Sequence, residues 1–303
     1  MTNKHQTEVT FLQLGDFTNY IITFLTLIIF TSTFLNADEK KIVFLADKGK
    51  NSKVHAHVDG NKILSDALIT SGLNIKTSLH KGWPEEASAF DDVDSVVIYC
   101  NGGKGHLVMK DLDLFEKLIN KGVGFVFMHY GVEVPKGRAG NLMLRAMGGY
   151  FETNWSVNPH WIAEIKTLPI HPITRGCKPF TQEDEWYYHM RFVSNMKGVS
   201  PILSAHPPMR TIKRKDGPHS NNPHVRKSMK AGEIQHIGWA YERPNKGRGF
   251  GTTGGHYHHT WNDDNWRTLI LNAIAWTAKI EVPKKGFPSK PNPLKHDHTD
   301  HKH

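Results

Sequence analysis

Residues 95–131, SVVIYCNGGKGHLVMKDLDLFEKLINKGVGFVFMHYG, decide the fold of this chain. Two short apolar runs, 95–100 and 124–129, flank residues 111–121, in which apolar side chains recur at helical spacing. Gly122 stands where the C-cap of that helix is expected. Strand, helix and strand at these intervals are typical of a parallel sheet. An open parallel sheet binds ligands in a crevice outside the carboxyl ends of its strands.

The same pattern continues on both sides of this unit. The sequence predicts further strands at 41–47, 73–79, 235–243 and 247–255, and further helices at 60–71 and 265–278. The middle of the chain, 148–208, is irregular, but it is too rich in aromatic residues for a disordered linker. The predicted fold class is therefore α/β, a flavodoxin-like parallel-sheet sandwich with long aromatic-rich insertions.

Composition describes an ordinary globular protein of 303 residues, with 38% hydrophobic and 22% charged residues. The formal net charge of +9 invites a nucleic-acid hypothesis, but the lysines and arginines are spread widely and no binding motif appears. We therefore expect no nucleic-acid partner. The two cysteines, Cys100 and Cys177, form no CxxC pair, which excludes a zinc site made of thiolates.

The N-terminal segment differs from the rest of the chain. Residues 21–35 are apolar and uncharged, and Ala37 precedes the charged run 38–41. This pattern is typical of a signal peptide and is shorter than the roughly 20 residues of a membrane span. The sequence thus predicts a signal peptide at 1–37 and a periplasmic or secreted protein, with an uncleaved anchor as the alternative. The main domain is expected at 38–282, followed by a disordered Pro/Lys/His-rich tail at 283–303.

Histidines gather at the expected carboxyl ends of the strands. His55 and His57 follow the first strand, His129 ends the strand at 124–129, and His256 follows two glycines after the last strand. Imidazole is the commonest protein ligand for metals. We expect a divalent metal ion, with zinc as one candidate, held by His129 and His256 together with His55 or His57. Three protein ligands and an open position are typical of catalytic zinc, which lowers the pKa of water toward about 7.

Other polar residues near these strand ends are candidates for substrate binding and proton transfer. Glu185 or His189, beside aromatic rings, is expected to act as general acid or base. Glycines after the strand at 95–100 let backbone N–H groups approach a ligand oxygen. The residues expected to bind substrate are Asn101, Gly102, Gly103, Glu133, Trp155, His160, Tyr188 and His258.

Several motifs together resemble one known family. They include KGWP at 81–84, GVGFVFMHYGVEVPKG at 122–137, DEWYYHMRF at 184–192 and GGHYH at 254–258. With the other matching segments they cover about residues 40–280, and the chain is similar to the ThuA-like (trehalose utilisation) family. The resemblance implies a class I glutamine amidotransferase-like fold and a role in sugar catabolism, often beside oxidoreductases that make 3-keto sugars.

Two departures from related sequences matter for the chemistry. In true class I amidotransferases a cysteine nucleophile follows the strand at 124–129, whereas this chain has His129 there. Glutamine hydrolysis through a thiolate therefore has no candidate residue. Relatives tend to carry a His-acid-His run early in the domain, and this chain reads His55-Ala56-His57, so the ligands remain and the acid is lost.

These observations predict an exported protein of carbohydrate catabolism, a metal-assisted hydrolase or lyase that acts on a glycoside or 3-keto-glycoside. Its partners are expected to be a carbohydrate substrate and, functionally, a sugar oxidoreductase. Two alternatives remain, a non-catalytic carbohydrate-binding protein and a sugar isomerase or epimerase. A catalyst should hold stoichiometric metal and a titratable base, while a binding protein needs only aromatic platforms.

Overall fold

A computed structural model describes residues 38–48 and 55–289. The signal peptide expected at 1–37 and most of the tail expected at 283–303 lie outside these residues. Within the described ranges, no helix is both long and apolar enough to cross a bilayer. A compact unit begins at Lys40.

A seven-stranded sheet forms the centre of this unit, in the order β2-β1-β3-β4-β11-β10-β9. The strands are β1 Lys40–Ala46, β2 Ile75–Lys81, β3 Ser95–Tyr99, β4 Gly124–Met128, β9 Val199–Ala205, β10 Gln235–Glu242 and β11 Arg248–Thr252. Neighbours from β2 to β11 run parallel, and β10 runs antiparallel to both β11 and β9. The predicted pair 235–243 and 247–255 is thus confirmed, and β11 joins it to the parallel strands.

The central parallel strands β3 and β4 are buried along their whole length because both faces of the sheet are covered there, whereas the edge strand β2 is polar and partly exposed. In β4, Val126 and Met128 belong to one hydrophobic core, and Phe125 and Phe127 belong to the other. This alternation follows from the two-residue period of a strand. All five residues of β4 are buried, so its sequence shows an uninterrupted apolar run instead of a polar alternation.

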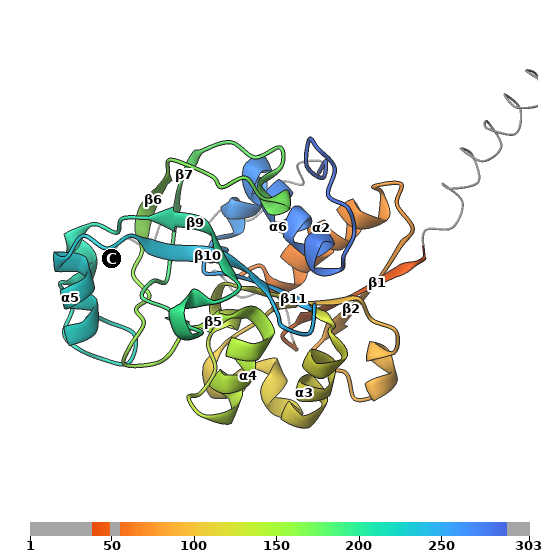
Figure 1. Ribbon diagram of the computed structural model, residues 1–303, viewed down its shortest axis with the longest axis horizontal. Helices are drawn as coiled ribbons and strands as arrows, with labels where there is room; N and C mark the ends of the chain where they lie inside the picture. The colour runs from red at the N-terminus through yellow and green to blue at the C-terminus, as the bar shows by residue number, and fades with distance from the viewer. Residues whose placement is uncertain (1–37, 49–54, 290–303) are drawn as a thin grey trace, which may run out of the picture. The chain divides into compact units, whose positions relative to one another are not determined.

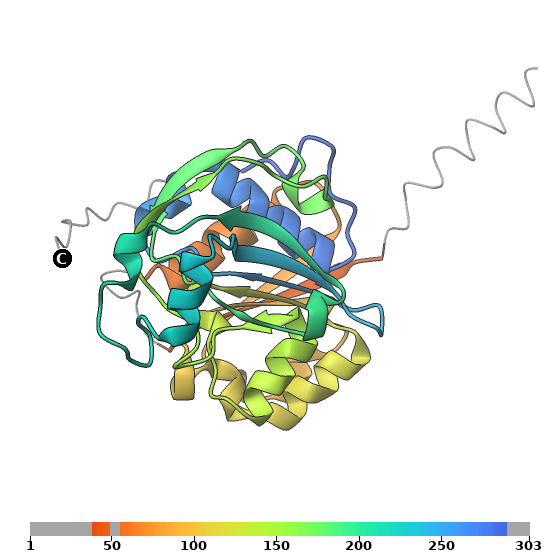
Figure 2. The same cartoon turned by 60° about the vertical axis from the view of Figure 1, so that its left-hand side comes forward.

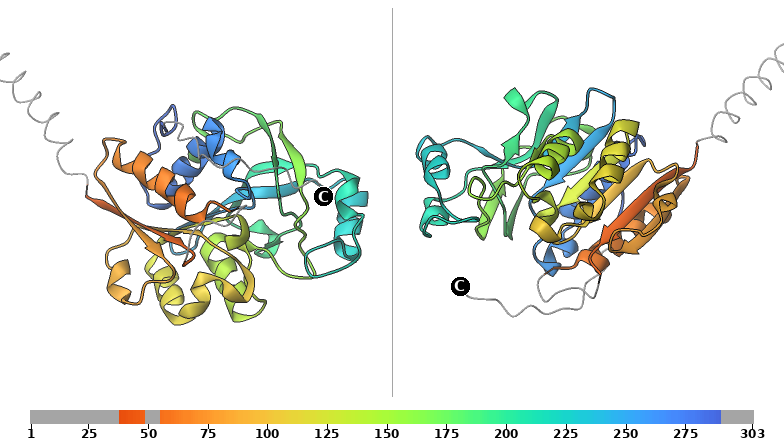
Figure 3. Two further views of the ribbon diagram at one scale, coloured as in Figure 1. Left: turned by 180° about the vertical axis from the view of Figure 1, so that it is seen from behind. Right: turned by 90° about the horizontal axis from the view of Figure 1, so that it is seen from below.

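Two helices cover each face of the sheet (Figure 1). Helices α2, His57–Ile69, and α6, Asp264–Thr277, lie together on one face, which Figure 3 shows from behind. Helices α3, Leu112–Lys121, and α4, Arg138–Met147, cover the other face. Asp263 caps α6 by accepting a hydrogen bond from the backbone N–H of Trp266 at 2.7 Å.

Besides β9 and short 3-10 helices, the segment between α4 and β10 builds two small antiparallel strand pairs and one α-helix. Strand β5, Gly149–Tyr150, pairs with β8, Arg191–Phe192, and β6, Trp161–Ile165, pairs with β7, Phe180–Asp184. The β6–β7 hairpin lies on the same side of the sheet as α6 (Figure 2), and α5 spans Pro223–Lys230. The ordered aromatic insertion expected at 148–208 is therefore present, and it brings the end of β7 toward the strand ends.

Packing continues after α6. Val282 and Phe287 are buried, and the Phe287 backbone N–H donates a hydrogen bond of 2.9 Å to Asn272 Oδ1 on α6. The packed chain thus extends past residue 282, where the sequence suggested that the domain ends.

Candidate metal centre

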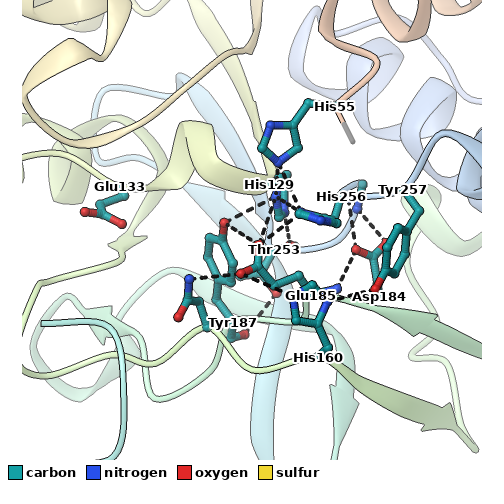
Figure 4. A network of polar contacts seen from close by, with 12 residues as sticks. His55, His129, Glu133, His160, Asp184, Glu185, Tyr187, Thr253, His256 and Tyr257 are labelled. Atoms are coloured by element: carbon teal, nitrogen blue, oxygen red, sulfur yellow. Dashed lines mark hydrogen bonds and ion pairs between the residues drawn. The ribbon is translucent and has the colours of Figure 1, made fainter. Parts of the chain in front are cut away.

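Three imidazoles converge at the carboxyl ends of β1, β4 and β11 (Figure 4). His129 Nε2 lies 3.2 Å from His55 Nε2 and 3.1 Å from His256 Nδ1. His55 Nε2 and His256 Nδ1 are 3.1 Å apart. With a carboxylate oxygen of Glu185, these ligand atoms all lie within 4.8 Å of one another. The structure therefore gathers the predicted residues His55, His129 and His256 into one site, and adds Glu185 to them.

Hydrogen bonding alone does not explain this triangle of nitrogens. A neutral imidazole nitrogen carries either one hydrogen or one lone pair, so at least one of the three contacts has no hydrogen bond. Ligands about 2.0–2.1 Å from a tetrahedral zinc ion lie about 3.4 Å from one another, close to the observed separations. The separations are therefore compatible with ligands of a single cation.

His129 occupies a strained position at the end of β4. It begins the short 3-10 helix His129–Val132 and has a φ of 52°, in the left-handed region that non-glycine residues rarely adopt. Its Nδ1 lies 2.9 Å from the carbonyl oxygen of Thr253. Because a carbonyl only accepts, Nδ1 carries the hydrogen and the lone pair of the neutral ring is on Nε2, which faces the other donors.

Burial keeps the rings of His55 and His129 uncharged. Burial, together with the neighbouring His57 and His256, lowers the pKa of His55 to about 3. Burial also lowers the pKa of His129 well below its usual value, with further contributions from His55 and His256. Both rings are consequently neutral at neutral pH, which is the form that binds a metal ion.

Glu185 joins the site through one carboxylate oxygen, and its other oxygen contacts Asn158 and lies near His160. Its Oε2 lies 3.0 Å from His256 Nδ1 and 3.5 Å from His129 Nε2. Oε1 accepts a hydrogen bond of 3.0 Å from Asn158 Nδ2 and lies 3.8 Å from His160 Nε2. The sequence predicted Glu185 as a general acid or base, and the structure places it directly against the histidines.

Two residues that hold this arrangement were not predicted as site residues. The buried carboxylate of Asp184 accepts hydrogen bonds from the backbone N–H groups of Glu185, Gly255 and His256, at 2.8, 2.8 and 2.9 Å. The Tyr187 hydroxyl lies 3.2 Å from His129 Nε2 and also 3.2 Å from Glu185 Oε2. Their position in the aromatic segment DEWYYH, directly around Glu185, is the sequence signal that could have identified them.

His57 does not join the ligand set, although it is the second histidine of the pair predicted to hold the metal. It begins α2, which directs its Nδ1 to Asp47 Oδ2 at 2.7 Å. Its ring stacks on His55, with centroids 4.9 Å apart and planes 12° apart. His57 thus supports the His55 ring from the side. Asp47 Oδ2 also accepts the backbone N–H of Asn101 at 2.9 Å.

The predicted catalytic residue His189 lies in another group of side chains. Its Nδ1 contacts the carbonyl oxygen of Trp155 at 3.1 Å, and its ring packs against the Trp155 indole. The guanidinium carbon of Arg191 stands 3.4 Å from the centroid of the Trp155 ring, and His224 packs on the same indole. The structure does not bring His189 or Trp155 to the histidines and Glu185.

Two other expected substrate residues are buried. The Tyr188 ring is fully buried, and its hydroxyl makes a hydrogen bond of 2.7 Å with Thr211 Oγ1. His258 is 2% exposed in the 3-10 helix His258–Asn262. His160 fits its prediction better, because its partly exposed ring lies beside His256 with centroids 5.1 Å apart.

The loop after β3 is occupied by contacts within the protein. The Gly103 backbone N–H donates to the Glu133 carbonyl oxygen at 3.0 Å, and a Cβ on Gly102 would lie 2.3 Å from the Tyr130 carbonyl oxygen. Glu133 itself is 2% exposed, and both of its carboxylate oxygens lie 3.0 Å from His219 Nε2. Figure 4 shows Glu133 apart from the four donors. His219 has no motif in the sequence that would have identified it.

Burial disfavours the thiolate form of both cysteines. Burial raises the pKa of the Cys100 thiol far above its usual value, and burial raises the pKa of Cys177 to about 12. His129 occupies the turn after β4.

Comparisons with known proteins agree with the resemblance found in the sequence. The fold resembles the crystal structure of a ThuA-like protein from Bacteroides uniformis, with a TM-score of 0.54, 17% identity and coverage of 80% of this chain and 92% of that chain. A ThuA-like protein from Parabacteroides merdae gives a TM-score of 0.50 at 15% identity, with 80% of this chain and 90% of that chain covered. No curated protein sequence matches the chain.

These likenesses confirm the predicted fold class, an α/β fold of the class I glutamine amidotransferase-like type. The model of one protein family, described as Trehalose utilisation, matches residues 41–277. Except for Lys40 at the start of β1, this range holds β1 to β11, α6 and all four donors of the candidate metal centre. The chain therefore belongs to the ThuA family, whose role is carbohydrate utilisation.

Proposed function

We propose that this protein is an exported, metal-dependent hydrolase or lyase that acts on a glycoside or 3-keto-glycoside. One observation carries the proposal, the convergence of His55, His129, His256 and Glu185 within 4.8 Å. Nitrogen and carboxylate donors in this number suit zinc and other first-row divalent ions. The family's role in carbohydrate utilisation supplies the class of substrate.

The chain's own residues divide the work. His55, His129 and His256 would hold the ion, and Thr253 fixes the ring of His129 in the binding tautomer. When bound, a divalent ion supplies Lewis acidity at neutral pH. The Tyr187 hydroxyl donates a hydrogen bond to Glu185 Oε2 and so keeps the Glu185 carboxylate beside His129.

Proton transfer would use Glu185 and His160. The His160 side chain is 37% exposed, and its Nε2 lies 3.8 Å from Glu185 Oε1, so it reaches both solvent and the carboxylate. In hydrolysis this pair would deliver a proton to the glycosidic oxygen. In a lyase it would accept a proton from a carbon made acidic by a neighbouring ketone. The contacts of His160 favour it over His189, which lies against Trp155.

Metal content and activity test this proposal together. The purified protein is analysed for bound metal by elemental analysis and assayed on trehalose and on 3-keto-trehalose, before and after treatment with a chelator. We expect stoichiometric metal, turnover of one substrate and loss of turnover on chelation with recovery on adding the ion back. Metal-free protein with full turnover would overturn the metal mechanism. Sugar binding without turnover of either compound would identify a carbohydrate-binding protein instead.

A further inference from the structure

A cavity of about 620 Å³ opens outside the carboxyl ends of β1, β2 and β3. Its walls include Asp47 after β1, Trp83 after β2, and Asn101 and Gly105 after β3. Strands β2 and β3 lie on opposite sides of β1 within the sheet, so the direction in which the chain adds strands reverses at β1. Such a switch point is where open α/β sheets bind ligands, and the volume lies within the usual range of small-molecule sites.

The walls combine an aromatic ring with hydrogen-bonding groups. Trp83 is partly exposed and packs against Phe90, with ring centroids 5.1 Å apart, so the indole is held in place. Asp47 uses Oδ2 to bind His57 and the Asn101 N–H, while Oδ1 makes no hydrogen bond within the described residues. An indole face and fixed polar groups suit a ring that carries hydroxyls.

The charges in the walls argue against an acidic ligand. Three carboxylates, Asp47, Glu85 and Asp111, stand against two ammonium groups, Lys48 and Lys110. An anionic sugar would therefore gain little binding energy from the charges of this cavity. A neutral sugar can donate hydrogen bonds from its hydroxyl groups to the carboxylates.

One hydrogen bond and one pair of stacked rings link the cavity wall to the candidate metal ligand His55. Asp47 Oδ2 lies 2.7 Å from His57 Nδ1, and the His57 ring stacks on His55 at 4.9 Å. A ligand bound to Asp47 would lie on the far side of the ring that supports a metal ligand. We propose that this cavity is the subsite for an uncharged pyranose ring of the substrate, next to the reacting ring. The inference rests on the proposed function, since it names where the non-reacting part of that substrate binds.

Gly105 allows the cavity to be filled without disturbing the fold. It lies in the 3-10 helix Gly103–Gly105, its φ is outside the left-handed region, and an added Cβ would meet no atom within 4 Å. Because Gly105 lines the cavity, Gly105→Phe adds an aromatic ring at the cavity wall, and Gly105→Ala is the matched control that adds only a methyl group there. Trp83→Ala removes the indole, and Trp83→Phe retains an aromatic face.

The test measures binding of trehalose, glucose and glucuronate to the full chain by calorimetry, after the metal has been removed with a chelator. We expect wild type to bind trehalose, and Gly105→Phe and Trp83→Ala to bind it at least roughly tenfold more weakly. Gly105→Ala and Trp83→Phe should stay within about threefold of wild type. Glucuronate should bind no more tightly than glucose.

Unchanged trehalose affinity in Gly105→Phe, or no saturable binding of trehalose or glucose to wild type, would overturn the subsite. Thermal melting of each variant checks that it is folded. Metal content of the same proteins, measured before chelation, keeps the two proposals apart. Stoichiometric metal without sugar binding contradicts only the subsite, and sugar binding without metal contradicts only the metal mechanism.

Discussion

Asp184 Oδ1 accepts a hydrogen bond of 2.9 Å from the backbone N–H of His256, although the two residues are 72 positions apart in the sequence. The same oxygen accepts the Glu185 N–H, and Oδ2 accepts the Gly255 N–H. The Asp184 side chain is fully buried. One carboxylate at the end of β7 thus fixes the backbone of two of the four candidate metal donors.

Asp184→Asn should weaken this anchor without removing a ligand. An amide has only one acceptor oxygen. Its NH₂ group would face backbone N–H groups whose hydrogen bonds Oδ1 or Oδ2 of Asp184 now accepts. We expect a loss of about 1–3 kcal/mol in the free energy of unfolding and metal affinity about 10–100-fold lower. Urea denaturation and competition with a metal indicator measure the two effects. The exposed Asp113→Asn is the control, and metal affinity equal to wild type in Asp184→Asn would refute the anchoring role.

His129→Ala should remove bound metal, because two other imidazoles and Glu185 converge on its Nε2. His129 is also fully buried, and the Thr253 carbonyl would lose its donor, so we expect a cost of about 1–3 kcal/mol in folding free energy. His80→Ala, on β2 and remote from the site, is the matched control and should keep its metal. Elemental analysis of the folded proteins measures their metal content. Equal metal content in His129→Ala and His80→Ala would contradict the proposal that His129 binds a metal ion.

The central strands could be predicted because their burial on both faces is encoded locally. The apolar runs at 41–47, 95–100 and 124–129 correspond to β1, β3 and β4 within one residue at either end. Helix α4 was not predicted, although Leu142, Met143, Ala146 and Met147 are all buried. Two glycines bound it, and Gly140 inside it lets Tyr150 approach so closely that a Cβ would lie 2.7 Å away. The apolar residues of α4 do recur at helical spacing, so the helix had a local signal, which the glycines at its ends and inside it obscured.

The ligand set was only partly predictable from the sequence. His129 and His256 follow strands that a parallel sheet brings together, so topology alone indicates that they meet. Glu185 reaches them from the β6–β7 hairpin, whose place beside α6 depends on packing of Trp161 and Trp186 in the core. His57 follows His55 closely in sequence, but it lies inside the first turn of α2 and faces Asp47.

Cleavage after Ala37 should leave the folded domain complete. Strand β1 begins at Lys40, whose backbone N–H already donates to the Asn74 carbonyl oxygen at 2.9 Å. We expect N-terminal sequencing of protein from the secreted or periplasmic fraction to begin at Asp38. Recovery of Met1 in that fraction, or protein found only in the cytoplasm, would contradict the signal peptide.

Tyr187→Phe isolates the contribution of one hydroxyl. The ring is buried against Phe151, with centroids 5.4 Å apart, and would remain in place. Loss of the contacts to His129 and Glu185 should free the Glu185 carboxylate, so kcat should fall about tenfold or more while the unfolding free energy changes by about 1.5 kcal/mol or less. Steady-state kinetics and denaturation measure both. Wild-type kcat would show that the hydroxyl does not position Glu185.

The Glu133–His219 pair predicts a pH dependence of stability. The hydrogen bond to Glu133 raises the pKa of His219 above 6.5, even though burial acts in the opposite direction. Glu185 adds to this upward shift and Arg214 opposes it. A raised folded-state pKa stabilises the protein fully below the unfolded pKa, and that contribution is lost as pH rises through the folded pKa.

Glu133→Gln should therefore destabilise the protein more in mild acid than in base. Gln keeps the size of the side chain but removes the charge that favours protonated His219. Because His219 is partly exposed, the difference between wild type and variant should change by no more than about 1 kcal/mol between roughly pH 5.5 and pH 9. Urea denaturation at both pH values measures it. Glu116→Gln, which breaks exposed ion pairs with arginines only, should show no such change over this range. A gap for Glu133→Gln that stays constant or widens toward pH 9 would show that protonated His219 does not stabilise the fold.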